Sequence, residues 1–384
     1  MSLEAQLEQC LSESEALHRR VRAFAESASE SFEDLALDIA RFQALHQPGF
    51  RRLCALHGSL LDRLSALPAL PTETFRIARV AVHPAKADWA RFFTSGTSGG
   101  PRGVHALRTA ETYRALALRS AEPALIAPWP GPRVVLALAP VPDRPWSSSL
   151  GFMMALFIEH YDGRSLGAIR FDVFDPNRWL VGPDGVNLRA VRSGARIALD
   201  RREPLLVLGT AFALAAMLDA LGGERVEAPE RTVVMVTGGF KGRRRDVDPE
   251  ELRRAVAHVF TIPEAQVVGE YGMTELTSEL YERTLSSAEG AQPFGVYVEP
   301  PWVRVDPVQP STLLPVADGD VGLARIVDLG NVDSAVAILT EDLVRREAGG
   351  IRLMGRRLRA EPRGCSLAVE DLVISAAESD RSRM

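Results

Sequence analysis

The sequence predicts an α/β protein with a mostly parallel sheet flanked by helices and a small β-rich subdomain. Three observations support this class. Helical patterns dominate residues 1–74, short apolar runs alternate with helical runs over 75–295, and Pro-rich connections separate strand-like runs over 296–360. Strands that alternate with helices form right-handed βαβ units and parallel sheets. These changes of pattern predict four parts, the last a tail at 361–384.

The N-terminal section carries a clear helix start in the stretch SFEDLALDIARF. Ser31 and Asp34 form a capping box, in which the serine hydroxyl accepts a backbone N–H of the first turn. Leu35, Ile39 and Phe42 follow at helical spacing and share one apolar face. A helix that begins just after Ser31 is therefore predicted.

The middle section alternates two kinds of pattern from FRIARVAV onward. Its strand-like runs are WARFF, RVVLALAP, LLVLG, RTVVMV and AQVVGEY, and its helical runs are TAETYRALALRSA, SSSLGFMMALFIEHY, AFALAAMLDAL and DPEELRRAVAHVF. The last helix is the best signalled, because Asp248 suits the N-cap, Pro249 the first turn and Glu251 a capping box. Beyond residue 295, GLARIVDL, AVAILT and GIRLMG predict strands.

Composition narrows the function classes. The 384 residues carry a formal net charge of −5 and no basic run, which argues against nucleic acid as a partner. The longest apolar run, Leu205 to Leu218, is shorter than the roughly 18 residues a membrane span requires. The N-terminus lacks the pattern of a signal peptide. We therefore expect a cytoplasmic enzyme with no membrane partner.

The cationic residues show a strong bias. Only two of the 45 basic residues, Lys86 and Lys241, are lysines. A lysine retained against this bias can be needed for its compact ammonium group, or it can be a chance survivor on the surface.

The stretch FTSGTSGGPRG follows a strand-like run and is rich in glycine and hydroxyl groups. Such a loop presents successive backbone N–H groups that bind anions, and glycine allows the close approach. Hydroxyls of Thr94, Ser95, Thr97 and Ser98 can donate to phosphate oxygens, and Arg102 can neutralise charge. Phosphate binding is one interpretation, and a flexible connection is the other.

A second interpretation of the same loop is a hydrolase nucleophile elbow, because Gly96 to Gly100 satisfies G-x-S-x-G with Ser98 as nucleophile. An elbow requires a helix directly after the serine. Glycines and a proline follow instead, and a helical pattern begins only near Thr109. The sequence disfavours this alternative.

Two further stretches open into glycine turns after strands: VVMVTGGFKGR, Val233 to Arg243, and VVGEYGMTE, Val267 to Glu275. With the loop at Thr94, they resemble the three nucleotide-binding signatures of the ANL superfamily of acyl-adenylating enzymes, whose first loop typically reads TSGTTGxPKG and whose later motif reads YGxTE. GGFKGR, the ending GRRLRAEPRGCSL and the length most resemble the acyl-protein synthetases, the fatty-acid-activating components of bacterial luminescence fatty acid reductases. The resemblance covers roughly residues 75 to 370.

The resemblance implies an ANL-type adenylation domain, with ATP and Mg²⁺ as cofactors. The implied nucleotide-binding residues are Thr94, Ser95, Gly96, Thr97, Ser98, Gly99, Gly100, Arg102, Gly103, Gly238, Gly239, Phe240, Tyr271, Gly272, Met273, Asp342 and Arg356. Thr274 would contact the α-phosphate, and Glu275 would hold Mg²⁺, which needs only one or two carboxylates. Tyr271 would stack on adenine, Asp342 would take the ribose hydroxyls, and Arg356 would contact the ribose or a phosphate. Each residue singly also fits an ordinary structural role.

Two departures from the superfamily pattern stand out. Arg102 replaces the usual lysine, which the arginine bias explains. The chain ends at Met384, so we expect it to lack the full C-terminal domain that supplies a catalytic lysine in longer relatives. Lys241 is our candidate for a cation near the carboxylate or the α-phosphate, with a surface lysine as the alternative.

The acyl substrate is not fixed by the sequence, so fatty, aryl and other carboxylic acids stay open. Trp146 to Tyr161 could wall an apolar tunnel, although a core helix is the simpler interpretation, and His160 could orient a substrate or be structural. The expected reaction is acyl-AMP formation with release of pyrophosphate. An acyl-accepting protein or a reductase is the expected partner. A catalytically silent nucleotide-binding subunit remains a third alternative.

The final acceptor of the acyl group is predicted to be Cys365. Cys10 and Cys54 lie in helical patterns, where small buried hydrophobes are expected. Cys365 follows a Pro and a Gly and lies near several arginines, which lower a thiol pKa and favour the nucleophilic thiolate. It matches the C-terminal acylated cysteine of the acyl-protein synthetases. A structural cysteine on the tail is the alternative.

Overall fold

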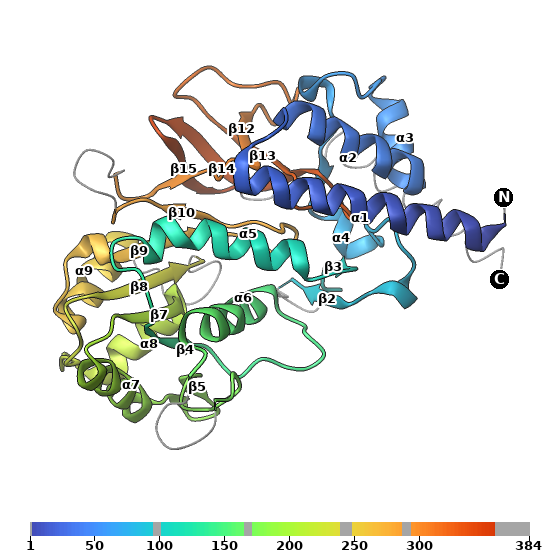
Figure 1. Ribbon diagram of the computed structural model, residues 1–384. Coiled ribbons are helices and arrows are strands. Elements are labelled where there is room, and N and C mark those ends of the chain that lie inside the picture. The colour runs from blue at the N-terminus through green and yellow to red at the C-terminus, as the bar shows by residue number, and fades with distance from the viewer. Residues whose placement is uncertain (1, 95–100, 165–170, 239–247, 286–292, 358–384) are drawn as a thin grey trace. The chain divides into compact units, whose positions relative to one another are not determined.

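The computed structural model describes residues 2–94, 101–164, 171–238, 248–285 and 293–357 (Figure 1). Contacts divide the chain into two compact units. Unit 1 comprises Met1–Leu116, Met273–Ser278 and Glu299–Met384, and unit 2 comprises Ala117–Gly272 and Glu279–Val298. The chain passes from unit 2 to unit 1 inside YGMTE, after Gly272. The four-part division inferred from the sequence stays a prediction.

Unit 1 begins with the predicted helices. They are α1 (Leu3–Ser27), α2 (Phe32–His46), α3 (Pro48–Leu56) and the short α4 (Thr74–Ile77). The Ser31 hydroxyl accepts the Asp34 N–H at 3.3 Å, which confirms the predicted start of α2. The apolar face of α2 is buried, with Leu35 and Ile39 fully enclosed.

The β-rich part of unit 1 is antiparallel. Its strands are β12 (Val303–Val308), β13 (Val321–Asp328), β14 (Ala337–Glu347) and β15 (Gly350–Arg356), paired in that order. The two-residue strand β1 (Leu70–Pro71) pairs parallel with β14. The three strands predicted from GLARIVDL, AVAILT and GIRLMG correspond to β13, β14 and β15 and are confirmed.

A separate hairpin carries the predicted phosphate loop. Strand β2 (Ala90–Phe93) pairs antiparallel with β3 (Val104–Leu107), and the loop joins them. The sequence analysis missed β3, because VHAL is too short to show a strand period. FRIARVAV, from which the alternation was expected, opens with a short helix. Phe75 to Ile77 lie in α4, and Val80 makes a single bridge to His105.

Unit 2 contains the predicted parallel strands, β4 (Val134–Leu138), β7 (Leu205–Thr210), β8 (Thr232–Thr237) and β9 (Val267–Tyr271). They pair in that order. The antiparallel strands β10 (Leu280–Glu282) and β11 (Val296–Val298) extend this sheet beyond β9. Strands β5 (Val181–Gly182) and β6 (Gly185–Val186) form a small hairpin. The parallel strands are buried on both faces, which explains their continuous apolar sequence.

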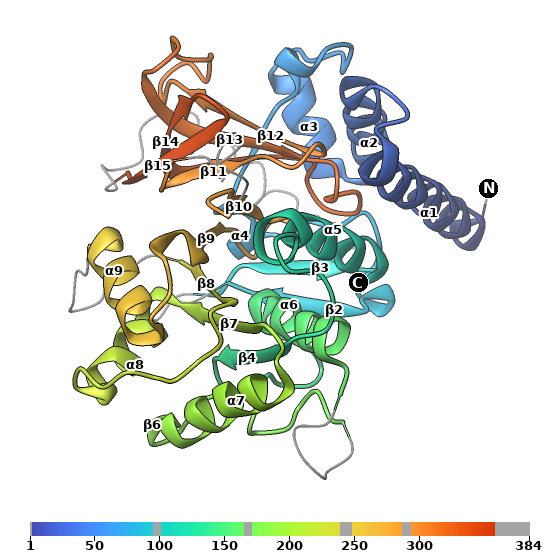
Figure 2. The ribbon, with the colours of Figure 1, turned by 60° about the vertical axis from the view of Figure 1, so that its left-hand side comes forward.

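Helices cover the parallel strands of unit 2. They are α6 (Ser149–Phe157), α7 (Leu188–Arg201), α8 (Ala211–Leu221) and α9 (Pro249–Phe260), and α5 (Glu111–Ala121) leads into the unit. Figure 2 shows α6 and α7 on opposite sides of β4. Asp248 accepts the Glu250 and Glu251 N–H groups at 2.8 and 3.0 Å, which confirms the predicted cap of α9.

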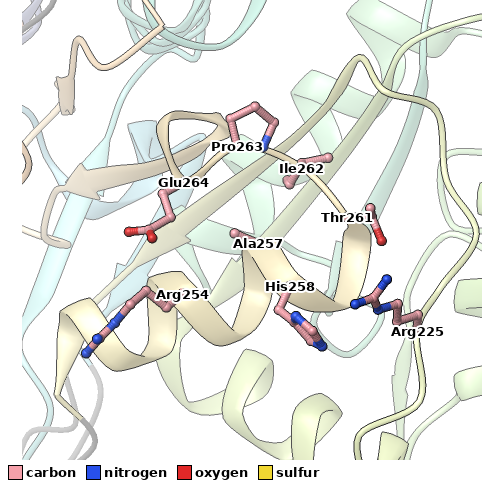
Figure 3. A pocket seen from close by; sticks show the side chains of 8 residues that line it. All are labelled: Arg225, Arg254, Ala257, His258, Thr261, Ile262, Pro263 and Glu264. Carbon is pink, nitrogen blue, oxygen red and sulfur yellow. The ribbon is translucent and has the colours of Figure 1, made fainter.

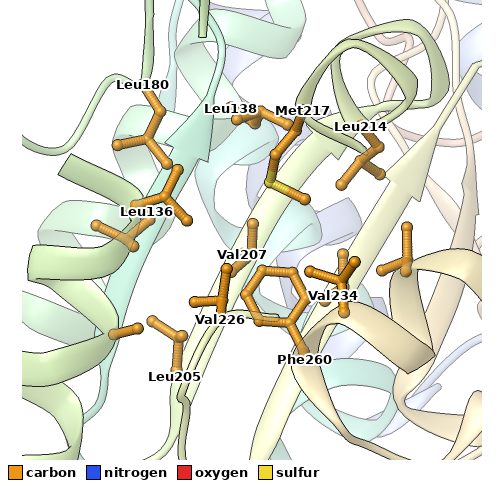
Figure 4. Close-up of a cluster of buried hydrophobic side chains, with 14 of the residues drawn as sticks. Leu136, Leu138, Leu180, Leu205, Val207, Leu214, Met217, Val226, Val234 and Phe260 are labelled. Carbon is orange, nitrogen blue, oxygen red and sulfur yellow. The ribbon is translucent and has the colours of Figure 1, made fainter. Parts of the chain in front are cut away.

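One hydrophobic core cluster of unit 2 lies between the strands and α7, α8 and α9. Figure 4 shows Leu136, Val207 and Val234 of the strands facing Met217 of α8 and Phe260 of α9. Gly194 lets α7 approach β4 closely. A Cβ there would lie 2.6 Å from Leu136 Cδ1, well inside van der Waals contact. In the part of the chain that the structure describes, no helix is both long and apolar enough to cross a bilayer.

Candidate active site

The base of the predicted phosphate loop is closed by Thr94 and Gly103. The Thr94 N–H donates to the Gly103 carbonyl at 3.0 Å, and the Gly103 N–H donates to the Thr94 hydroxyl at 2.8 Å. A Cβ at Gly103 would lie 2.9 Å from Thr94 Cγ2, so a larger residue would force the Thr94 side chain to shift. Ser95, Gly96, Thr97, Ser98, Gly99 and Gly100 lie outside the described residues.

Arg102 folds back over the hairpin. Its Nε donates to the Thr94 carbonyl at 2.6 Å and its Nη2 to the Phe93 carbonyl at 3.1 Å. The guanidinium lies 5.2 Å from the centre of the Phe93 ring, a cation–π contact. Arginine has five N–H donors in a planar fork, and the hairpin uses two of them here. In this structure, Arg102 braces the base of the loop.

The β2–β3 hairpin differs from the strand–turn–helix arrangement of a hydrolase nucleophile elbow. Pro101 to Gly103 are not helical, and β3 starts at Val104. A nucleophile elbow needs a helix that begins directly after its serine. The chain returns as a strand instead, so the geometry does not support Ser98 as a hydrolase nucleophile.

Tyr271 and Gly272, the first half of YGMTE, lie in unit 2. Tyr271 ends β9, is buried, and has its ring 6.0 Å from that of Tyr297. A Cβ at Gly272 would lie 2.4 Å from Glu270 Oε1, so a larger residue would require the Glu270 carboxyl to move. The glycine of the motif therefore has a local steric reason.

The second half, Met273 to Glu275, starts a turn in unit 1 in which the Leu276 N–H donates to the Met273 carbonyl at 3.1 Å. Thr274 and Glu275 are half-buried. Asn331 Nδ2 donates to the Glu275 carbonyl at 2.9 Å. The half-buried Glu275 carboxylate suits Mg²⁺, which binds through one or two carboxylates and substrate phosphates.

Asp328 anchors the residues that follow this turn. It accepts the Thr277 N–H at 2.9 Å and the Ser278 hydroxyl at 2.7 Å, and it is fully buried. Burial raises the pKa of the Asp328 carboxyl, although these hydrogen bonds oppose the shift. The sequence analysis missed Asp328 and Asn331. Their only local signal is the polar stretch DLGN directly after the apolar run GLARIV.

Asp342 and Arg356 are brought together. They are directly opposed on β14 and β15, and Arg356 Nε lies 4.0 Å from Asp342 Oδ1. A bulge produces this register, since the pairing shifts by one residue and Gly355 adopts a φ of 116° that favours glycine. The Asp342 side chain is mostly buried, and Arg356 is exposed.

Gly238 directly follows β8 and has a φ of 68°, a conformation that favours glycine. Gly239, Phe240 and Lys241 lie outside the described residues. Beside Gly238, the Thr237 side chain hydrogen-bonds Glu270, a buried carboxyl that the sequence analysis missed. Burial raises the pKa of Glu270 to about 7, against the effect of this hydrogen bond.

The structure describes two of the three cysteines. Cys10 on α1 and Cys54 on α3 are buried free thiols, as predicted. Burial raises the pKa of each to about 11. Cys365 lies outside the described residues.

The structure also places the predicted core helix, His160 and Lys86. Residues Phe152 to Ile158 are buried, which confirms the core-helix interpretation of this stretch. His160 is exposed and packs edge-on to Tyr161 at 4.9 Å. Lys86 is also exposed.

A groove in unit 2 contains none of these residues. It has a volume of about 510 Å³ and lies along α9, between Arg225, Arg254, His258 and Glu264 (Figure 3). It is wide open and polar. Among the described residues, no group of three or more His, Cys, Asp and Glu side chains is arranged to hold a metal ion.

Comparison with solved structures defines the class. The chain is similar to a 2-hydroxyisobutyryl-CoA ligase in an open conformation, with a TM-score of 0.57 and 12% identity over 86% of this chain and 76% of that one. The thioesterification state of that ligase gives a TM-score of 0.59, with 13% identity over 85% and 67%. The fold is that of the acyl-adenylating ligases.

The sequence comparisons give the family. A family model described as acyl-protein synthetase, LuxE, matches residues 22–373, and the chain belongs to this family. A long-chain-fatty-acid–luciferin-component ligase of Vibrio harveyi is 21% identical over 81% of this chain and 79% of its own. The ligase of the same name from Aliivibrio fischeri is 20% identical over 74% and 70%. The chain is therefore an acyl-adenylating ligase.

Proposed function

We propose that the protein activates a fatty or related carboxylic acid with ATP and Mg²⁺, and then transfers the acyl group to Cys365. In the first step, a carboxylate oxygen attacks the α-phosphorus and pyrophosphate leaves. In the second step, the Cys365 thiolate attacks the acyl carbonyl, a C–S bond forms and AMP leaves. A fatty acid is the favoured substrate class, because two relatives carry long-chain-fatty-acid ligase names.

Cys365 is proposed as the acyl acceptor because the other two thiols are buried. Cys10 and Cys54 are 3% and 6% exposed, and a pKa near 11 keeps each thiol protonated at neutral pH. Only the thiolate is a good nucleophile. Cys10 is also engaged, since its Sγ donates to the Val82 carbonyl at 3.7 Å. Cys365 is thus the cysteine best suited to hold an acyl group.

The nucleotide roles follow the three signatures. Backbone N–H groups and hydroxyls of Thr94 to Gly103 hold the phosphates, while Gly238, Gly239, Phe240 and Tyr271 receive the adenine. Thr274 contacts the α-phosphate, Asp342 and Arg356 the ribose, and Lys241 the carboxylate or α-phosphate. Positioning and charge neutralisation supply most of the rate acceleration. The opposed pair on β14 and β15 supports the ribose assignment, because two separately assigned residues lie together.

Mg²⁺ would be held by Glu275 and by phosphate oxygens of the nucleotide. When bound, the ion neutralises charge on the phosphates. Glu275 is suited to this task because its main chain is fixed by Asn331 and its side chain is half-buried. An acyl-accepting protein, such as a reductase component, is the partner that would take the acyl group onward.

Pyrophosphate release tests the activation step. Release should require ATP, Mg²⁺ and a carboxylic acid, and a panel of C4 to C18 fatty acids and aryl acids defines the substrate. Glu275→Gln should lower the rate by about 100-fold, the scale of a lost electrostatic contact in the transition state, with an unchanged melting temperature. Glu264→Gln, at an exposed carboxylate in unit 2, is the matched control. Tight ATP binding without pyrophosphate on any acid would instead identify a silent nucleotide-binding protein.

A further inference from the structure

His105 occupies the strand that leaves the phosphate loop, three residues after Arg102. It is 2% exposed, and its ring lies edge-on to Phe75 with the ring centres 5.7 Å apart. Its two ring nitrogens have different partners. Nδ1 lies 2.7 Å from the Thr274 carbonyl oxygen, and Nε2 lies 2.9 Å from the Ser334 hydroxyl. His105 therefore connects three segments that are far apart in sequence, all within unit 1.

The partners determine the tautomer. A carbonyl oxygen only accepts hydrogen bonds, so Nδ1 must carry the proton and donate to Thr274. In the neutral ring Nε2 is then an acceptor, and the Ser334 hydroxyl donates to it. Burial lowers the pKa of His105 to about 4, so the ring is neutral at physiological pH.

The contact falls on the turn that carries Thr274 and Glu275. Asn331 Nδ2 donates a hydrogen bond to the Glu275 carbonyl, and His105 Nδ1 donates one to the Thr274 carbonyl. Two consecutive carbonyls of this turn are thus held by side chains that come from elsewhere in unit 1. An arrangement of this kind fixes the two peptide planes that flank the Glu275 Cα, the first of which also joins Glu275 to Thr274, and with them the starting direction of the Glu275 side chain.

We propose that His105 is a positioning residue for adenylation, which acts through the main chain of Thr274 and sets the placement of Thr274 and Glu275. The inference rests on the proposed function. The same histidine belongs to β3 and pairs with Phe92 of β2, the strand that leads into the phosphate loop. One side chain thereby couples the hairpin of the phosphate loop to the turn of the metal-binding motif.

Two substitutions separate this role from a general contribution to folding. His105→Asn places an amide N–H near the position of Nδ1, toward Thr274. His105→Gln places its longer amide near the position of Nε2, toward Ser334. We expect Asn to retain adenylation within about threefold of wild type and Gln to lose about 10- to 100-fold, the scale of a small misplacement of reacting groups. His57→Asn, at an exposed histidine of the same unit, is the matched control.

The experiment measures pyrophosphate release with dodecanoate across a Mg²⁺ titration, together with calorimetric binding of ATP in Mg²⁺ and in EDTA, and melting curves. His105→Gln should raise the Mg²⁺ concentration for half-maximal rate and reduce the gain in ATP affinity that Mg²⁺ provides. The KM for dodecanoate should change by less than about twofold.

Equal behaviour of the Asn and Gln variants, or a Gln variant with a wild-type response to Mg²⁺, would overturn the inference. The inference is also overturned if adenylation is lost only because the variants no longer fold, and His105→Asn is as unstable as His105→Gln. If wild type binds ATP but releases no pyrophosphate with any acid, the proposed function fails. The comparison of ATP affinity with and without Mg²⁺ then still decides the role of His105.

Discussion

Asp342 on β14 and Arg356 on β15 are cross-strand neighbours, with Arg356 Nε 4.0 Å from Asp342 Oδ1. At this separation, with Arg356 exposed, the pair contributes little to stability. A β-bulge, in which Gly355 adopts a positive φ that favours glycine, nevertheless places the two residues directly opposite each other. We interpret the pair as a preformed site for polar groups of the ribose.

Asp342→Asn should therefore impair ATP use more than folding. We expect the KM for ATP to rise about tenfold or more, the effect of losing a charge-assisted hydrogen bond of roughly 1.5–3 kcal/mol, while the melting temperature changes little. Glu341→Gln is the control, because consecutive residues of a strand point to opposite faces. An equal KM for ATP in the two variants would remove Asp342 from the nucleotide site.

Lys241→Arg should impair adenylation more than Arg102→Lys does. Lys241 is one of two lysines in a chain that otherwise uses arginine, which suggests that arginine cannot replace it. Arg102 donates to two carbonyls of the hairpin and would meet a phosphate as a cation, and lysine can retain part of that role. Pyrophosphate release by the two variants under identical conditions makes the comparison. Small and equal effects would assign Lys241 to the surface.

Gly194→Ala should destabilise the protein, although alanine is the better helix former. The added Cβ would lie 2.6 Å from Leu136 Cδ1 in a closely packed core. Overpacking costs about 1–3 kcal/mol, against a gain in helix propensity of about 1 kcal/mol. Thermal unfolding should show a melting temperature a few degrees lower. A combined Gly194→Ala and Leu136→Val variant, which returns some space, should recover part of the loss. A stabilised Gly194→Ala would contradict this packing.

Glu270 should make stability depend on pH. Burial raises its pKa from the ordinary value of 4.5 to about 7, so between these pH values the folded protein binds a proton that the unfolded chain does not. The resulting stabilisation, about 3 kcal/mol from the 1.36 kcal/mol per pKa unit, is complete below pH 4.5 and is lost as pH rises through 7.

Glu270→Gln provides the comparison, because the amide keeps the shape without the titration. The free energy of unfolding of wild type, minus that of Glu270→Gln, should fall between pH 4.5 and 7 and be flat above pH 8. Chemical denaturation at a series of pH values measures this difference. A difference that is constant or rises over this range would show that Glu270 is ionised in the folded protein.

The sequence predicted those features that depend on nearby residues. The caps of α2 and α9 and the alternation of strands and helices from β7 to β9 rest on spacings of a few positions, and the structure confirms them. The contacts of His105 with Thr274 and of Asn331 with Glu275 join residues separated by 169 and 56 positions. No local pattern specifies such pairs. The β3 strand was missed because four residues carry too little periodicity.

The glycines of the candidate site also depend on residues that are distant in the sequence or hidden in strands. The glycines were predicted from motifs, but the reasons for Gly103 and Gly272 emerge only from their neighbours, Thr94 and the buried Glu270 carboxyl. Glu270 itself gave no signal, because an acidic residue inside an apolar strand resembles an ordinary edge residue in the sequence. Its burial follows from the strands on both sides, Thr237 of β8 and Tyr281 of β10 being its paired neighbours.

Acylation of Cys365 tests the central claim most directly. Wild-type protein is incubated with ATP, Mg²⁺ and the fatty acid that supports pyrophosphate release, and is then analysed by mass spectrometry of the intact chain and of its peptides. We expect one acyl group, removable by hydroxylamine, on the peptide that contains Cys365. Cys365→Ala should still release pyrophosphate but carry no adduct, whereas Cys54→Ala should be acylated as wild type. An adduct that persists in Cys365→Ala, or an adduct on Cys10 or Cys54, would contradict the claim.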